Sequence, residues 1–511
     1  MQTIEFLKDE LWYGGVIFHA DRYPISSKDE YTFDMGVNRS CNQFNPVFIS
    51  NKGRYLWCGD GGEIRFVKGI IYVYSDTIKL ESSGTTLKEA SLAAAKKYYP
   101  ATGTTPDKRA FLAPQYCSWV VLLWSQNQEG ILNYARSIIE KGYKPGLFII
   151  DDTWQKDYGV WEFNKDNFPD PDAMMKELND MGFLVSMWFC PYISPDSPAI
   201  NEAFPGTFEH MQKKRLIMDG ERPRIVYWWE GYSAMLDFKE RSAVEWINAR
   251  TKYLEEKYGV AGFKLDGGDP IYTGLDYADA TKQSTLYIDS IQNSFKEARS
   301  CYKLAGKPII QRLNDKAHMW ESKLDEDLLG LSSLLPGIMT QGLVGYYYGC
   351  PDMVGGGMSA DFIDKSNLDA ELIIRWCQAS ILMPMVQFSY DVWNHKENHI
   401  AEYCGKALAL REKLLPYIVE MIERASITNE PVIRYMEYQF PEKCFSGMKD
   451  QFMLGDKYLV APVLEKGARE RKIVFPDGQW KDIENGNIYN GGECMVEVPL
   501  DKLSVFEIID K

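Results

Sequence analysis

Charged side chains follow a short apolar segment in GFKLDGGDP, residues 262–270. Apolar residues alternate there with Lys264 and Asp266, which is typical of a strand, and two glycines and Asp269 follow. Residues two apart on a strand lie on the same side, so Lys264 can keep the Asp266 carboxylate ionised. The segment therefore predicts a carboxylate held ready for reaction at the end of a strand.

Acidic residues also follow other apolar segments. Asp151 and Asp152 follow one in FIIDDTW, Asp315 in IIQRLND and Asp352 in YYYGCPDM. A single Asp at a strand end often only caps the next helix. Residues that cap helices need not lie close to one another, whereas acid–base catalysis needs several carboxylates in one site. The number of acidic strand ends in this sequence therefore favours a catalytic role.

Motifs for metals, nucleotides and phosphates are missing from the sequence. His395 and His399 are four residues apart but have no HExxH pattern around them, and no GxGxxG or GxxxxGK motif is present. A metal-dependent hydrolase, with IDDTW and KLDGGD as the metal-binding segments, is an alternative. The position of Lys264 argues against it, because the lysine would lie beside the metal ion. We expect no cofactor and no metal.

Paired carboxylates without a cofactor suit glycoside hydrolysis. One carboxylate attacks the anomeric carbon and the other protonates the leaving oxygen; in the retaining mechanism they lie about 5 to 5.5 Å apart. The acid needs a drier pocket, and Met319 and Trp320 follow Asp315 closely. Asp325 and Asp327 are rival acids, which we interpret as parts of a solvated acidic loop.

The residues between 109 and 428 are expected to position these groups. Short apolar segments alternate there with amphipathic helical patterns, roughly eight times, which predicts an α/β fold with a closed (β/α)8 TIM barrel. We expect strands in CSWVVLLW and GLVGYYYG, and a long helix reaching Arg299. Trp119 and Trp124 lie on or beside the first strand, where we favour a place in the core.

Strand-and-turn patterns flank the predicted barrel. Residues 1–108 indicate an N-terminal β-sandwich, and residues 429–511 a small C-terminal β-sandwich domain.

Composition limits the partners and the compartment. The chain has 511 residues and a formal charge of −15, which argues against nucleic acid and anionic membranes. Its N-terminus does not look like a signal peptide, no apolar stretch reaches the length of a membrane span, and the ten cysteines form no CxxC pair. We expect a cytoplasmic enzyme acting on a small glycoside or oligosaccharide; the sequence is compatible with a homo-oligomer.

The motifs resemble those of glycoside hydrolase family 31. FKLDGGD is similar to the family's nucleophile motif, which assigns that role to Asp266. DKAHMW matches the pattern Asp-x-x-x-x-Trp of the general acid/base, which assigns Asp315, and Arg299 stands sixteen residues earlier, as in the family. PDMVGGG and DQFMLGDKYLVAPVLEKG are similar to later segments of the family.

The resemblance implies a retaining, exo-acting α-glycoside hydrolase. The residues implied to bind the sugar are Asp151, Asp152, Trp154, Trp188, Lys264, Asp269, Arg299, Arg312, Trp320 and Asp352. The motif combination is most similar to a branch with α-galactosidases, which implies an axial C4 hydroxyl. The sequence departs from that branch at Asp269, where Glu is usual, and in a longer segment from Trp320 to Pro336.

Two alternatives stay open. An α-glucosidase or transglycosylase of the same family would share the chemistry. A catalytically silent sugar-binding barrel would keep Trp154 and Trp188 but would not depend on Asp266.

Overall fold

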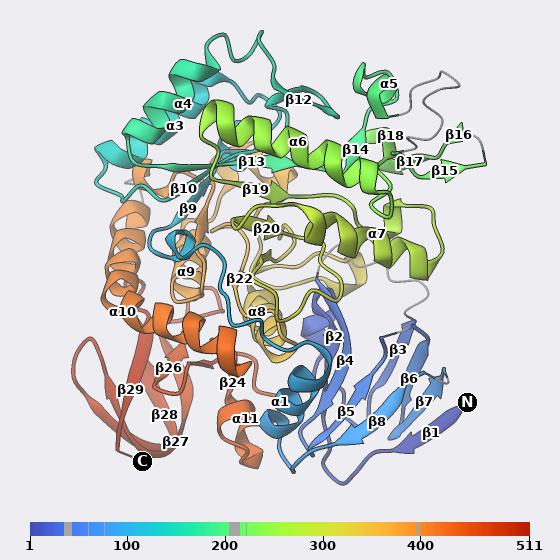
Figure 1. The fold of residues 1–511 in the computed structure, drawn as a ribbon. Helices are drawn as coiled ribbons and strands as arrows, with labels where there is room; N and C mark the ends of the chain where they lie inside the picture. The colour runs from blue at the N-terminus through green and yellow to red at the C-terminus, as the bar shows by residue number, and fades with distance from the viewer. Residues whose placement is uncertain are drawn as a thin grey trace.

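The protein is a parallel barrel with antiparallel sheets at both ends of the chain. The computed structural model describes residues 1–34, 43–59, 61–75, 77–203, 215–220, 222–395 and 399–510. Figure 1 shows the barrel in the middle, with the N-terminal and C-terminal sheets side by side below it. The predicted fold class, a TIM barrel with β domains before and after it, is confirmed.

Eight parallel strands form the barrel. In chain order they are β9 (Gln115–Cys117), β10 (Leu147–Ile150), β13 (Leu184–Phe189), β19 (Gly262–Leu265), β20 (Lys296–Ala298), β21 (Ile310–Arg312), β22 (Gly349–Cys350) and β23 (Gln387–Phe388). β9 pairs with both β10 and β23, and a parallel bridge from Met353 to Gln387 completes the ring. Strands covered on both faces are buried throughout, which is why they are short apolar segments.

Helices surround the barrel (Figure 1). The longer ones are α3 (Gln128–Glu140), α4 (Pro171–Asp180), α6 (Arg241–Tyr258), α7 (Tyr277–Ser290), α8 (Leu334–Leu343), α9 (Ala370–Ser380) and α10 (Ile400–Thr428). Side chains cap several starts: Asn127 accepts from the Gly130 amide and Asp170 from the Ala173 amide. α6 ends at Gly259, which has the left-handed conformation that glycine favours.

Three predicted elements of the barrel are wrong in detail. CSWVVLLW is not one strand, since β9 ends at Cys117 and a short helix, α2 (Trp119–Leu122), follows. GLVGYYYG mostly lies between the end of α8 and the two-residue strand β22.

The predicted helix to Arg299 ends nine residues early, at Ser290, and β20 precedes Arg299. Pairing of β20 with both β19 and β21 overrides the helical propensity of this segment. The strand buries Glu297 inside the barrel, where its Oε1 lies 3.6 Å from Arg312 Nε. Arg299 is thereby placed at a strand end.

A large insertion follows β13. It includes a three-stranded antiparallel sheet with the order β14 (Tyr192–Ile193), β18 (Gly231–Met235), β17 (Ile225–Trp228). It also holds the helix α5 (Ala199–Ala203) and the pair β15 (Met218–Asp219) and β16 (Arg222–Pro223). A shorter pair, β11 (Gln155–Asp157) and β12 (Val160–Phe163), follows β10.

Two four-stranded antiparallel sheets form the N-terminal part. Their orders are β1 (Gln2–Glu5), β7 (Ile70–Tyr74), β6 (Glu63–Val67), β3 (Glu30–Asp34), and β2 (Trp12–Val16), β4 (Phe44–Ser50), β5 (Arg54–Trp57), β8 (Lys79–Ser82). Phe48 of one sheet contacts Phe33 and Phe66 of the other, so the sheets pack face to face. The helix α1 (Leu87–Tyr98), which the sequence analysis does not assign, follows with a capping box at Thr86.

One six-stranded antiparallel sheet forms the C-terminal part. Its order is β24 (Ile433–Tyr435), β25 (Phe452–Leu454), β26 (Tyr458–Ala461), β29 (Ser504–Asp510), β27 (Glu470–Asp482), β28 (Ile488–Glu497). Its strands hydrogen-bond into one sheet rather than into two. The Tyr13 hydroxyl donates to Glu437 and thus joins the first and last parts of the chain. None of the helices in the described ranges combines the length and apolarity needed to cross a membrane.

Candidate active site

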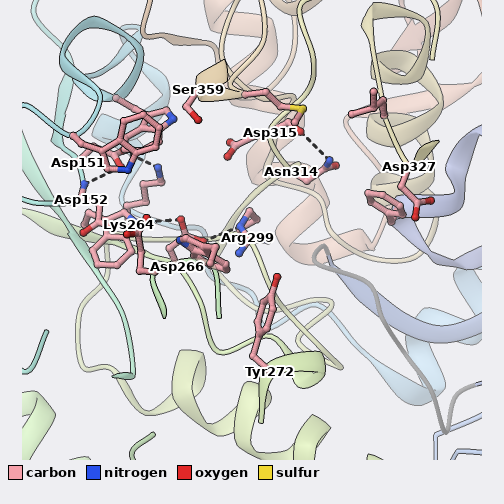
Figure 2. A pocket seen from close by; sticks show the side chains of 18 residues that line it. Asp151, Asp152, Lys264, Asp266, Tyr272, Arg299, Asn314, Asp315, Asp327 and Ser359 are labelled. Atoms are coloured by element: carbon pink, nitrogen blue, oxygen red, sulfur yellow. Dashed lines mark hydrogen bonds and ion pairs between the residues drawn. The ribbon is translucent and has the colours of Figure 1, made fainter. Parts of the chain in front are cut away.

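A cavity of about 550 Å³ opens at the carboxyl ends of the barrel strands. This is the end at which TIM-barrel enzymes carry their catalytic groups. Four predicted carboxylates, Asp151, Asp152, Asp266 and Asp315, line it together (Figure 2). The other lining residues are Phe18, Trp119, Trp124, Trp188, Trp229, Glu230, Lys264, Tyr272, Arg299, Asn314, Asp327, Leu328, Met358 and Ser359.

Asp266 is fixed by its place directly after β19. Its carboxylate accepts hydrogen bonds from Arg299 Nε at 2.7 Å, the Gly267 amide at 3.0 Å and Trp188 Nε1 at 3.1 Å. Gly267 has a φ of +66°, and a Cβ there would lie 2.8 Å from the ring of Tyr192. Glycine is therefore required for the turn that holds Asp266 in place.

The Asp266 carboxylate is held ionised. Burial raises its pKa, but the positive charges of Arg299 and Lys264 outweigh burial and hold the pKa well below its usual range. Arg299 also donates to Asp269 at 3.0 Å and lies over the Trp229 ring, 5.0 Å from its centroid. Arg299 is thus held on three sides with its guanidinium against Asp266.

Lys264 and Asp151 form a buried ion pair on the floor of the cavity. Lys264 Nζ lies 2.7 Å from Asp151 Oδ2, and the two side chains are 5% and 3% exposed. The predicted role of Lys264 toward Asp266 is therefore exerted through its charge, since the direct partner of its ammonium group is Asp151. Burial lowers the pKa of Lys264, but the Asp151 charge more than compensates and raises it.

Asp152 has a different environment from Asp151. It accepts hydrogen bonds from Gln155 Nε2 and the Tyr158 hydroxyl, both at 2.9 Å. Burial outweighs these bonds and raises the pKa of Asp152 to about 7. The cavity therefore contains one carboxyl group that can be protonated near neutrality.

Asp315 lies across the cavity from Asp266 (Figure 2). Arg312 Nη1 is 2.6 Å from Asp315 Oδ1 and 2.7 Å from Asp352 Oδ1. Asp352 is fully buried, and its other oxygen accepts from the Lys316 amide at 2.8 Å. Burial raises the pKa of Asp352, Arg312 opposes this, and the charge of Asp315 adds to it.

The side chain of Asp315 is 41% exposed, whereas that of Asp266 is 11% exposed. One carboxylate is thus buried and ionised, and the other is open to solvent. Paired carboxyl groups in unlike environments suit a nucleophile and a general acid/base.

Several predicted sugar-binding residues lie outside the cavity lining. Asp269, Arg312 and Asp352 are buried behind it and hold Arg299 and Asp315 in place.

Trp154 and Trp320 also lie outside that lining. Trp154 is fully buried; its Nε1 donates to the Trp188 carbonyl and its ring packs on Phe163. The positive φ of Thr153, 70°, belongs to the turn that sends Trp154 into the core. Trp320 is partly buried, and its Nε1 donates to Asp369. A direct sugar contact is therefore not supported for either tryptophan.

Two tryptophans expected in the core both line the cavity. Trp119 and Trp124 contact each other, with ring centroids 5.6 Å apart, and Trp124 is 48% exposed. Leu123, between α2 and Trp124, has a φ of 49°, which turns the chain toward the mouth. The core interpretation is wrong for Trp124, whereas Trp119 packs against the core and also lines the cavity.

The sequence analysis misses much of the cavity's outer wall. Phe18 comes from the N-terminal part, Trp229 and Glu230 from the turn between β17 and β18, and Tyr272 from the loop after β19. Burial raises the pKa of Glu230. The segment RIVYWWEGYSAM has alternating residues around a Glu-Gly turn, and this hairpin pattern could have identified Trp229 and Glu230.

A metal site is not evident in the described ranges of the chain. No group of three or more His, Cys, Asp or Glu side chains is arranged there to hold an ion.

Comparisons with known proteins identify a family. The model of the glycosyl hydrolases family 31 TIM-barrel domain matches residues 112–421, and that of the family's C-terminal domain matches residues 429–507. The myogenesis-regulating glycosidase of Mus musculus is 28% identical over 430 residues, which cover 80% of this chain and 58% of that protein. The 1,3-alpha-isomaltosidase of Kribbella flavida is 27% identical over 421 residues, with 76% and 55% covered.

A solved structure shows the same fold. A family 31 dextranase of Flavobacterium johnsoniae, complexed with glucose, has a TM-score of 0.81 at 18% identity, covering 99% of this chain and 66% of that one. The chain spans less than two thirds of the length of the two curated relatives named here. On the match of its barrel and of its C-terminal sheet, the chain belongs to glycosyl hydrolase family 31.

Proposed function

We propose that the protein is a retaining, exo-acting α-glycosidase that uses Asp266 as nucleophile and Asp315 as general acid/base. The observation that carries the proposal is the pair itself: both carboxylates line one cavity, from neighbouring parts of the barrel mouth, and only Asp266 is pressed against Arg299. Membership of family 31 supports the same chemistry.

In the first step, an Asp266 oxygen bonds to the anomeric carbon while the bond to the leaving oxygen breaks. Asp315 gives its proton to that oxygen, and a glycosyl-enzyme forms. Arg299 and Lys264 keep Asp266 ionised before the attack. The three donors on its carboxylate also fix its orientation, so that little reorganisation is needed.

Asp315 is the acid of this step, and it lies beside a buried charge cluster. Arg312 faces Asp315, Asp352 and Glu297, so three carboxyl groups surround one guanidinium. Burial raises the pKa of Asp352 in this cluster, and the charge of Asp315 adds to the effect. In the second step water attacks the glycosyl-enzyme, Asp315 takes the water proton, and the sugar leaves with its original anomeric configuration.

An exo mode of attack agrees with the depth of the site. The Lys264–Asp151 pair and Asp266 form a buried floor, while Trp124, Trp229 and Tyr272 lie nearer the surface. A sugar at the end of a chain can reach such a floor, with the leaving group directed outward.

The finer proposal is that the sugar is galactose in α linkage. It is supported by the motif combination WYGG, IDDTW, FKLDGG and CPDMVGGG, which is most similar to the α-galactosidase branch. α-Glucosidase is the second candidate, favoured by the names of the isomaltosidase and dextranase relatives. Transglycosylation would follow if a sugar hydroxyl replaced water in the second step.

A panel of aryl glycosides tests the proposal. We expect hydrolysis of p-nitrophenyl α-galactoside faster than of the α-glucoside and the N-acetyl-α-galactosaminide. The first-formed anomer, followed by proton NMR, should be α. A β product would contradict the retaining mechanism. Absence of turnover on the panel, together with unchanged sugar binding by Asp266→Asn, would favour a catalytically silent barrel.

A further inference from the structure

The hairpin of β17 and β18, labelled in Figure 1, has an exposed aromatic face, and its turn lines the cavity. Ile225, Tyr227 and Tyr232 are 48%, 66% and 68% exposed, respectively. Tyr227 and Tyr232 are cross-strand partners with ring centroids 5.1 Å apart. The other face of the hairpin, with Val226 and Trp228, is buried in the protein. Exposed apolar patches of this kind mark binding surfaces.

A second hollow, of about 510 Å³, lies against this face. Tyr227 and Ile271 contribute apolar walls. Its polar lining includes Asp219, Arg222 and Arg224. Arg224 Nη1 donates to the Gly274 carbonyl, while its Nε has no hydrogen-bond partner within the described residues. The hollow thus combines tyrosine rings with charged side chains.

Tyr272 connects the two hollows, because it lines both of them. Its ring lies 5.6 Å from that of Trp229, which lines the active-site cavity. A molecule leaving the cavity past Trp229 and Tyr272 therefore meets Tyr227 next.

We propose that this outer hollow, with the Tyr227–Tyr232 face, binds the second sugar unit of the leaving group. The proposal rests on the proposed glycosidase function and makes the substrate an oligosaccharide rather than a simple glycoside. Sugar rings present apolar C–H faces that pack on aromatic rings, and their hydroxyls bond to planar groups such as guanidinium and carboxylate. Continuity with the cavity and the mixed lining favour a sugar chain over a second copy of the protein.

The test compares long and short substrates. The variant Tyr227→Ala/Tyr232→Ala removes two exposed rings, so its fold should be kept; thermal unfolding verifies this. The matched control is Tyr74→Ala, a 43% exposed tyrosine of β7, outside both hollows. Substrates are p-nitrophenyl α-galactoside and α-glucoside, and the trisaccharides raffinose and isomaltotriose.

We expect the double variant to lose at least about tenfold in kcat/KM on the hydrolysed trisaccharide, mainly through KM. Its kcat/KM on the aryl glycoside should stay within about twofold of the wild type. For Tyr74→Ala, kcat/KM on the trisaccharide and on the aryl glycoside should both stay within that limit. Equal losses on both substrates, or no loss on the trisaccharide, would overturn the proposal. Loss of a dimer in sedimentation without a trisaccharide effect would assign the face to contacts between copies.

Failure of the proposed glycosidase function can be distinguished from failure of the outer binding site. If the wild type hydrolyses none of the four substrates, calorimetric titration of Asp266→Asn with raffinose and isomaltotriose takes over. Binding that weakens when the tyrosine pair is also removed would support the outer site without turnover. Absence of binding of both trisaccharides would overturn it.

Discussion

The two proposed catalytic carboxylates differ because their surroundings differ. Asp266 is nearly buried and touches Arg299, whereas Asp315 is half exposed and shares Arg312 with Asp352. The same side-chain type is thereby suited to attack in one place and to proton transfer in the other. Function at this scale is set by neighbours rather than by the residues themselves.

Replacement of Asp315 tests the proton-transfer role. Asp315→Asn should lower kcat/KM about 100- to 10,000-fold on sugar leaving groups, and much less on activated aryl leaving groups, which need little protonation. The control is Asp327→Asn, the rival acid on the same cavity wall. Asn suits its left-handed φ of 54°, and any loss should be the same for both kinds of leaving group. A leaving-group dependence in the Asp327 variant instead would transfer the role to that residue.

Asp152 offers a test by pH. Its pKa is raised to about 7 in the folded protein, so folding keeps a proton that the unfolded chain loses above about pH 4. The contribution of Asp152 to the stability of the wild type should therefore fall as pH rises from 4 to 7. The side chain at position 152 cannot ionise in the variant Asp152→Asn. The free energy of unfolding of the variant minus that of the wild type should therefore increase by up to about 4 kcal/mol between pH 4 and pH 7.

Urea unfolding at pH 4, 5, 6, 7 and 8 measures this difference. Asp166→Asn, which removes a surface charge, should show no comparable trend. A difference between Asp152→Asn and wild type that does not change with pH would show that Asp152 is ionised in the folded state at acid pH.

Residue roles were predictable where a strand end fixes direction. Asp151 and Asp266 each follow a predicted barrel strand directly, so the strand determines which way they face. Arg299 was assigned through the family resemblance, because the strand before it was not predicted. Trp154 was not predictable, because one residue with positive φ, Thr153, redirects it. Such a turn leaves only a weak sequence signal when the residue is not glycine.

At the scale of elements, the barrel register aligns the site. Leu265 of β19 is paired with Ala298 of β20, so Asp266 and Arg299 leave their strands at the same level. β20 has three residues and contains Glu and Lys, and the sequence before it continues a helical pattern. Local sequence could not identify it, since its stability comes from two neighbouring strands. The longer strands β10, β13 and β19, with strong apolar patterns, were predicted.

The loop after β22 positions Asp315 through a glycine. A Cβ on Gly357 would lie 2.5 Å from Met353 Cε, 3.0 Å from Asp315 Oδ1 and 3.1 Å from Asp352 Oδ1. Gly357→Ala should displace the carboxylates and lower kcat/KM about 10- to 100-fold with the fold kept. Gly405→Ala in α10, where nothing lies within 4 Å, should leave kcat/KM unchanged and raise stability by up to about 1 kcal/mol.

Steady-state kinetics and thermal unfolding of the two glycine variants provide the measurement. If Gly357→Ala keeps the kcat/KM of the wild type, the Asp315 carboxylate is not held in place by the packing around Gly357.

For the whole molecule, segments next to the N-terminal sheets contact the cavity and the barrel directly. Phe18 lines the cavity, and Gln43 Nε2 lies within hydrogen-bond distance of the carbonyls of Ala298, Arg299 and Arg312. Gln43 is fully buried and accepts from Gln341 Nε2 at 2.6 Å. The sequence predicted separate domains. Local sequence patterns cannot predict contacts between residues hundreds of positions apart, so this link between the parts was not predicted.

Removal of this link should affect both parts. Gln43→Ala removes a donor that three buried carbonyls share and should cost about 1 to 3 kcal/mol in free energy of unfolding. It should also lower kcat/KM, because it loosens the Arg299 backbone. Gln479→Ala, on the exposed part of β27, is the control. Denaturation followed by tryptophan fluorescence and by far-UV circular dichroism should give one shared transition; a separate early transition in Gln43→Ala with normal activity would contradict the coupling.

A retaining mechanism with Asp266 as nucleophile requires a covalent bond between the sugar and Asp266, which mass spectrometry detects. The enzyme is incubated with a 5-fluoro-α-glycosyl fluoride of the sugar it hydrolyses, digested and sequenced. We predict one added fluoroglycosyl mass on the peptide that contains residues 262–270, located on Asp266 and absent from Asp266→Asn. An adduct on another residue, or full activity with no adduct and an inverted product, would contradict the account.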